Sequence, residues 1–169
     1  MPDWDMIIRE HKAAVWRTAY RLVGNPSDAE ECMQEAFVAA VAAARRSPVR
    51  NWRALLRRLA MARGIDCLRR RSSNRVRIQD ESALASAMDR EAFPDAVAQK
   101  RELVERLRLA LAQLPPLQAQ AACLRYLDEM EYEEISQELQ ISVRHVGVVL
   151  SRAREQLRKL LKERGTDHG

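Results

Sequence analysis

The sequence has few of the residues that interrupt helices or that favour strands. Among 169 residues there are only 5 glycines and 6 prolines, and aromatic residues make up 5%. No alternating run of β-branched residues occurs, so a composition dominated by Ala, Leu, Arg and Glu predicts an all-α protein. No apolar stretch approaches the roughly 18 residues that a membrane-spanning helix needs, so we expect no membrane insertion and a cytoplasmic location.

Cysteine and histidine are equally scarce, with three of each. The cysteines have no metal-ligand spacing, and we expect Cys32, Cys67 and Cys123 to be small core residues. The histidines have no carboxylate or nucleophile at a telling spacing, and no glycine-rich phosphate loop occurs. The sequence therefore predicts neither an enzyme nor a bound cofactor or metal ion.

Positive charge is concentrated in the first half of the chain. Residues 1–75 contain 15 Lys and Arg against 8 Asp and Glu, whereas residues 76–97 contain 2 against 5. The whole chain has a formal net charge of +5 and a sequence pI of about 9.5. Arginine carries most of this charge, and its planar guanidinium suits phosphate and guanine, so the balance favours a nucleic-acid partner.

Periodicity and capping residues divide the first 75 residues into three expected helices. The first runs from Asp3 to Val23, and Gly24-Asn25-Pro26 ends it. Ser27, with Glu30 three residues later, forms a capping-box pattern that predicts the start of the second helix. The third helix is expected from Trp52 to about Arg71, with a dense arginine face.

The composition changes after Arg75. Residues 76–97 are acidic and lack an apolar stripe, so they predict a flexible linker with a short helix around Glu81 to Met88. We therefore expect two small helical domains, residues 1–75 and residues 98–169, joined by this linker.

Four helices are expected in the second domain. Two of them, Gln99 to Leu114 and Leu117 to Leu127, are separated by Pro115-Pro116. A short amphipathic helix from about Tyr132 to Leu139 and a long helix from Ser142 to Leu161 then outline a helix-turn-helix.

The last helix has two distinct faces. Its apolar residues recur at steps of three and four and predict a buried seam that includes Val143, Val146 and Leu150. The opposite, outward face includes Arg144, Val148 and Arg152. In the major groove arginine can pair with guanine and a small apolar side chain can touch the thymine methyl group. This pattern alone leaves DNA binding and an ordinary helical hairpin equally open.

Six short motifs occur in order along the chain. They are SDAEECMQEAF (27–37), IDCLRRR (65–71), LPPLQ (114–118), LRYL (124–127), YEEI (132–135) and ISV (141–143). Together they resemble the extracytoplasmic-function (ECF) class of bacterial RNA polymerase sigma factors, and the resemblance spans about Ile7 to Leu161. It implies a factor that directs promoter recognition and transcription initiation with core RNA polymerase and promoter DNA as partners.

The resemblance also implies a role for each domain. The first would bind the clamp of the largest polymerase subunit through Glu31, Gln34 and Glu35. It would hold the minus-ten element with aromatic and cationic side chains, namely Trp52, Arg53, Arg57, Arg58, Arg69 and Arg70. The second would contact the flap of the second-largest subunit, and an anti-sigma protein is a further implied partner. In the minus-thirty-five major groove it would place Arg144, His145, Val148 and Arg152.

The chain departs from the family pattern at several positions. Gln140 replaces the usual glycine of the turn, and a left-handed backbone there would store about 1–2 kcal/mol of strain. Gly147 and Val149 replace cations of the last helix, and Ala62 falls where an Arg-Asn pair is usual. Two other interpretations therefore stay open. One is a helix-turn-helix regulator that binds DNA without polymerase, and the other is a sigma-like decoy that binds an anti-sigma protein.

Overall fold

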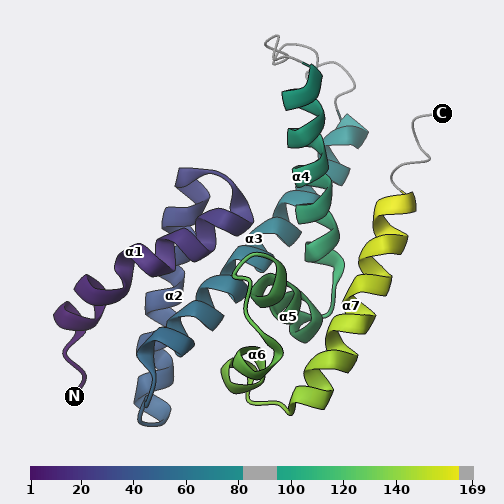
Figure 1. Cartoon of the computed structure of the whole chain (residues 1–169). Helices are drawn as coiled ribbons and strands as arrows, with labels where there is room; N and C mark the ends of the chain where they lie inside the picture. The colour runs from purple at the N-terminus through teal and green to yellow at the C-terminus, as the bar shows by residue number, and fades with distance from the viewer. Residues whose placement is uncertain (82–94, 164–169) are drawn as a thin grey trace.

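The structure, a computed structural model, describes residues 1–81 and 95–163, with side chains placed for residues 1–75 and 95–163. These described ranges hold seven helices and no strand, which confirms the all-α prediction (Figure 1). No helix in them is long and apolar enough to cross a membrane. Residues 82–94, which include most of the expected linker and of its expected short helix, lie outside the described residues.

The first group of helices consists of α1 (Trp4–Val23), α2 (Pro26–Arg46) and α3 (Trp52–Glu81). All three pack against one another. Helix α3 continues to Glu81, so the predicted end near Arg71 is wrong and residues 76–81 of the expected linker are helical. No glycine or proline occurs between Arg71 and Glu81 to stop the helix.

Helix α2 begins earlier than the sequence predicted. Asn25 is the N-cap, and its Oδ1 accepts a hydrogen bond from the backbone N–H of Asp28 at 2.8 Å. Pro26 follows at the first helical position, where no N–H is required and where the fixed φ of proline suits the helix. The capping box expected from Ser27 and Glu30 is therefore wrong, because a suitable cap stands two residues upstream.

The second group consists of α4 (Asp95–Gln113), α5 (Pro116–Tyr126), α6 (Tyr132–Leu139) and α7 (Val143–Glu163). The predicted α6 and α7 form the expected helix-turn-helix. Gln140 ends α6 with a φ of 56° and a ψ of 43°, and its N–H donates to the carbonyl of Ser136. The left-handed turn that glycine would favour is thus kept with a glutamine, at a conformational cost of about 1–2 kcal/mol.

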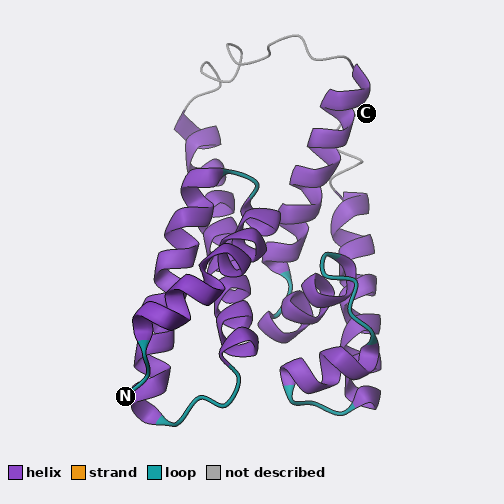
Figure 2. Ribbon diagram, turned by 60° about the vertical axis from the view of Figure 1, so that its left-hand side comes forward, coloured by secondary structure: helices purple, strands orange, loops and turns teal. Residues whose placement is uncertain are grey.

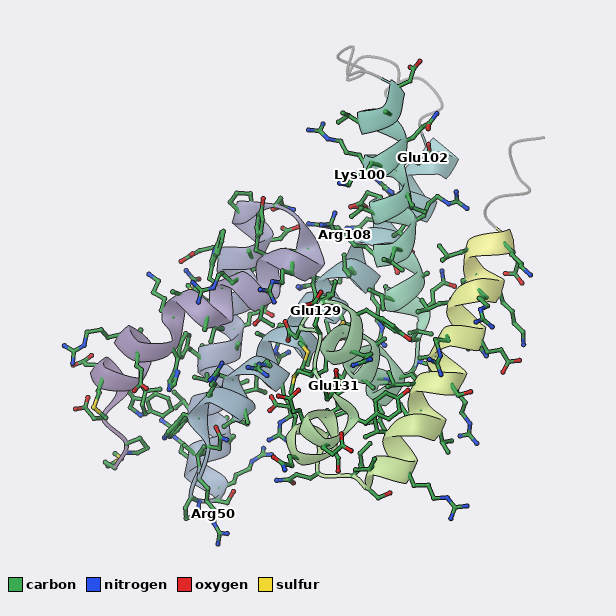
Figure 3. All side chains as sticks on the ribbon, in the orientation of Figure 1. Arg50, Lys100, Glu102, Arg108, Glu129 and Glu131 are labelled. Carbon is green, nitrogen blue, oxygen red and sulfur yellow. The ribbon has the colours of Figure 1, made fainter. Side chains whose placement is uncertain are left out.

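The two groups of helices lie against each other, as Figure 2 shows. One hydrophobic cluster includes Leu22 and Cys67 from the first group and Leu124 and Val146 from the second. Arg108 on α4 points toward the end of α1 (Figure 3), and its guanidinium fills the space beside the backbone of Gly24. The division into domains at residues 76–97 stays a prediction.

All three cysteines are buried and free, as expected of core residues. Burial raises the pKa of Cys32 and the pKa of Cys123 to about 12. Both side chains are therefore thiols at neutral pH, and they pack as small apolar groups.

Two helical glycines provide a matched test of the packing. A Cβ at Gly64 would lie 2.8 Å from Cδ1 of Leu22 on α1, whereas a Cβ at Gly147 would meet Cε2 of Tyr132 at an ordinary 3.8 Å. Gly147→Ala should raise the free energy of unfolding by about 1 kcal/mol through helix propensity. Gly64→Ala should lower it by about 1–3 kcal/mol, because α1 and α3 must move apart. Urea unfolding measures both values, and a stabilised Gly64→Ala variant would contradict the close crossing.

Candidate nucleic-acid interface

The outward face of α7 carries one group of candidate DNA contacts. Arg144, His145, Val148 and Arg152 are all exposed. Ser142 caps this helix, since its Oγ accepts from the N–H of His145 at 3.1 Å. Within the described residues neither Arg144 nor Arg152 forms an ion pair or a side-chain hydrogen bond. The structure therefore leaves these two guanidinium groups accessible to a ligand.

The inner face of α7 differs from the expected seam at its edges. Val146 and Leu150 are fully buried as predicted, but Val143 is 41% exposed and Val149 only 4% exposed. Val143 and Val149 lie on opposite edges of the buried seam, at the same angle from its centre around the helix axis. Periodicity alone therefore cannot predict which of the two valines is buried. Val149 is a core residue in this structure, whereas Gly147 is partly exposed. The effect of these two departures on DNA binding stays a prediction.

The candidate residues on α3 fall into two sets. Arg53 and Arg70 are exposed, and Trp52 is half-buried with its ring edge-to-face on Trp4 at 5.2 Å between centroids. The other candidates contact the second group of helices, and they are Arg57, Arg58 and Arg69.

Arg69 of α3 packs against the C-terminal end of α4. Its Nε donates to the carbonyl of Ala112 at 2.8 Å and its Nη2 donates to the carbonyl of Leu114 at 2.9 Å. Carbonyls at the end of a helix have no helical N–H partner, and the negative end of the helix dipole favours a cation. In this arrangement Arg69 therefore caps α4, and its Nη1 lies 3.6 Å from Oδ1 of Asp66 on α3.

Arg57 and Arg58 face α6 and the residues before it. Nη1 of Arg57 lies 3.3 Å from Sδ of Met130 and 3.8 Å from Oε1 of Glu138. Nη1 of Arg58 donates to the carbonyl of Glu138 at 3.4 Å. Burial raises the pKa of Glu138 above its ordinary value, and the two arginines partly offset this effect. Part of the expected strand-binding surface thus forms the contact between the two groups.

An acidic loop between α5 and α6 completes this contact. Figure 3 shows Glu129 and Glu131 on the loop. Asp128 pairs with Arg21 of α1 at 2.5 Å, and Glu131 lies 3.3 Å from Nη1 of Arg125 on α5. The loop therefore places the carboxylate of Asp128 against the first group, while Glu131 pairs within the second group.

Sequence reasoning missed Arg21 and Arg71 as contact residues. Nη1 of Arg71 donates to the carbonyl of Val23 at 2.7 Å, and Nη2 pairs with Asp28. The amide of Asn25 and this guanidinium hold the pKa of Asp28 below its ordinary value. A signal was present in the sequence. Successive residues of a helix are about 100° apart, so when Arg70 faces outward, Arg69 and Arg71 lie toward the two edges of the buried face.

The candidate polymerase contacts lie on α2. Glu31 and Gln34 are exposed, Glu35 is half-buried, and Val38 beside them is 71% exposed. These positions share one helix face at spacings of three and four. In the part of the chain that the structure describes, no cluster of His, Cys, Asp or Glu could hold a metal ion.

Comparison with known protein families gives two matches along the chain. Residues 7–74 match the family model of sigma-70 region 2, and residues 104–157 match that of sigma-70 region 4. The two matches correspond to the two groups of helices.

Individual relatives agree with these matches. The ECF RNA polymerase sigma factor SigE of Mycolicibacterium smegmatis is 32% identical over 171 residues, which cover 99% of this chain and 65% of that protein. The ECF RNA polymerase sigma factor SigW of Bacillus subtilis is 27% identical over 164 residues, covering 93% of this chain and 88% of that protein. The chain thus spans about two thirds of the length of the first relative.

A solved structure has the same fold. It is the sigma factor RpoE in complex with the anti-sigma factor NepR from Bartonella quintana, with a TM-score of 0.50 and 20% identity. The likeness covers 96% of this chain and 98% of that chain.

The buried carboxylate of Glu138 predicts a pH-dependent stability. Because its pKa is raised in the folded state, the folded chain binds a proton more tightly than the unfolded chain, and stability is lost as pH rises through this window. Glu138→Gln should therefore raise the free energy of unfolding at pH 7 and have little effect below about pH 4, where glutamate is protonated in both states.

Urea unfolding at pH 7 and at pH 4 measures this difference. Glu102→Gln on the exposed part of α4 is the matched control and should change little at either pH. A Glu138→Gln variant that is less stable than the parent at pH 7 would show that the ion pair with Arg57 outweighs the burial cost.

Proposed function

The chain belongs to the sigma-70 family of RNA polymerase sigma factors, within the ECF class, and on this premise we propose that it directs core RNA polymerase to promoters and starts transcription. The observation that best supports the proposal is the presence of both sigma regions, in order, on one chain. We propose that it acts as a non-catalytic initiation factor in the cytoplasm, where core polymerase lies.

The α2 face is the proposed docking site for the clamp of the largest subunit. Glu31 and Gln34 supply an exposed polar and acidic edge, and Val38 supplies an apolar contact beside it. A surface of this kind suits a protein partner with basic residues rather than a nucleic acid. The second group of helices is proposed to contact the flap of the second-largest subunit.

The α7 face is the proposed reader of the minus-thirty-five element. Arg144 near the helix start can pair with guanine, Val148 can touch a thymine methyl group, and Arg152 can reach a phosphate. Because Val149 is buried, Gly147 is the position at which the DNA-facing side lacks a cation found in the family.

The α3 face is the proposed site for the melted minus-ten strand. Arg53, Arg70 and the edge of Trp52 are accessible in the present arrangement, whereas α6 and the loop before it cover Arg57 and Arg58. We propose that polymerase binding draws the two groups of helices apart, because both arginines can reach a strand only when α6 moves away.

The alternative functions receive less support. A regulator that binds DNA without polymerase would need its cations accessible in the isolated chain, yet Arg57, Arg58 and Arg69 are engaged internally. A decoy would have no use for the accessible arginines on α7. An anti-sigma protein stays a proposed partner, because the similar RpoE was solved with NepR.

Transcription with purified core polymerase tests the proposed function. The chain should be captured by core polymerase, and sequencing of the transcripts should reveal start sites that share one promoter pattern. Glu31→Arg combined with Gln34→Arg should weaken capture by about tenfold or more through charge repulsion. Glu10→Arg, a reversal of an exposed charge on α1, is the control and should leave capture unchanged.

A second variant separates DNA reading from polymerase binding. Arg144→Ala combined with Arg152→Ala should keep capture but lose promoter-specific transcripts, and the slope of log affinity against log salt should fall by about one to two. Failure of the parent chain to bind core polymerase would overturn the proposed function.

A further inference from the structure

A cationic cavity lies where α1 and α3 meet the loop between α5 and α6. Its volume is about 160 Å³. The polar side chains that line it include His11, Arg17, Arg21, Arg53, Arg57 and Asp128. Val15 and Leu56 form an apolar wall. The proposed sigma function uses Arg53 and Arg57 of this lining but none of the residues that α1 contributes.

The charges around the cavity are not balanced. Of the four arginines, Arg21 is neutralised by Asp128 at 2.5 Å. The carboxylate closest to Arg57 is that of Glu138, at 3.8 Å and beyond hydrogen-bond distance. In residues 1–75 and 95–163 neither Arg17 nor Arg53 forms an ion pair. Cations that converge on a partly apolar hollow repel one another, and a bound anion relieves that repulsion.

Phosphate is the anion that these side chains suit. Guanidinium groups present paired N–H donors that match the oxygens of phosphate, and several of them can share one phosphate group. The cavity is large enough for a phosphate group but not for a nucleoside as well.

A second cavity of about 550 Å³ adjoins the first and shares Arg21, Arg53, Arg57 and Asp128 with it. Its own lining adds two amides, Asn51 and Gln137, and two carboxylates, Glu134 and Glu138. The carboxylates would repel a second phosphate, whereas the amides can hydrogen-bond hydroxyl groups. The two cavities together therefore fit a ligand with one phosphate and an uncharged polar body.

We propose that the joined cavities bind a phosphate monoester with a hydroxyl-bearing neutral body, such as a sugar phosphate or a nucleoside monophosphate. The phosphate lies among Arg17, Arg53 and Arg57, and the body extends toward α6. Because Asp128 and Glu138 belong to the second group of helices, the ligand contacts both groups and holds them together. Binding of this ligand does not require the proposed sigma function. It would compete with the proposed strand contacts of Arg53 and Arg57 and oppose the proposed separation of the two groups.

Isothermal titration calorimetry of the full chain tests the proposal. The ligands are ribose 5-phosphate, adenosine 5′-monophosphate and, as the phosphate-free control, ribose. Both phosphate esters should bind saturably with one site per chain, and ribose should not bind. Arg17→Gln and Arg53→Gln should each weaken binding of the esters about tenfold or more. Arg9→Gln and Arg75→Gln, which remove exposed arginines of the same two helices, should leave affinity unchanged.

Three results would overturn the proposal. The first is the absence of saturable binding by either ester at low salt, and the second is an equal loss of affinity in the Arg9→Gln control. The third is binding of a thymidine decanucleotide that depends on Arg17 when neither ester binds, since the cavity would then belong to a DNA path. Circular dichroism of each variant verifies that its helices are intact. No polymerase is present, so failure here is distinct from failure of the sigma function.

Discussion

Arginine side chains that close the C-terminal ends of helices hold this molecule together. The pairs are Arg69 with the carbonyls of Ala112 and Leu114, Arg71 with Val23, Arg58 with Glu138, and Arg106 with Leu161. The C-terminal end of a helix presents carbonyls without N–H partners, and it is also the negative end of the helix dipole. One guanidinium can donate hydrogen bonds to these carbonyls and place a positive charge beside the dipole. Most of these arginines come from α3, which makes α3 the common support of α1, α4 and α6.

Helix α3 also carries the proposed contacts to the minus-ten strand. Arginines of one helix thus both stabilise the fold and supply the proposed strand contacts, which links stability to function. Arg53 and Arg70 face outward, while Arg58 and Arg69 face helix ends of the second group. A nucleic-acid strand offers phosphate oxygens to the donors that now bind carbonyl and carboxylate oxygens of the chain itself. Strand binding as proposed would therefore compete with the closed arrangement for Arg57 and Arg58. The ion pair of Asp128 in the loop before α6 with Arg21 on α1 further stabilises the closed arrangement.

Local signals in the sequence predicted most of the fold. The end of α1 at Gly24 and the bounds of the short α6 were predicted, because both depend on neighbours within a few residues. Errors at the local level arose where two signals competed, as with the two caps at the start of α2. The internal partners of Arg57, Arg58 and Arg69 were not predictable, because they lie 43 to 80 residues away in the chain. Periodicity identified the centre of the buried face of α7 but not its edges, where Val143 is exposed and Val149 is buried. It also did not predict which helices cover the arginines of α3.

Neighbouring arginines on α3 divide between internal support, as at Arg69, and an exposed outward face, as at Arg70. Urea unfolding of Arg69→Ala beside Arg70→Ala tests this division most directly. We predict that Arg69→Ala lowers the free energy of unfolding by about 1.5–3 kcal/mol, because two carbonyls lose a charged donor. Arg70→Ala should change it by less than about 0.5 kcal/mol, as for other exposed positions. Equal losses in the two variants, or a larger loss in Arg70→Ala, would contradict the account.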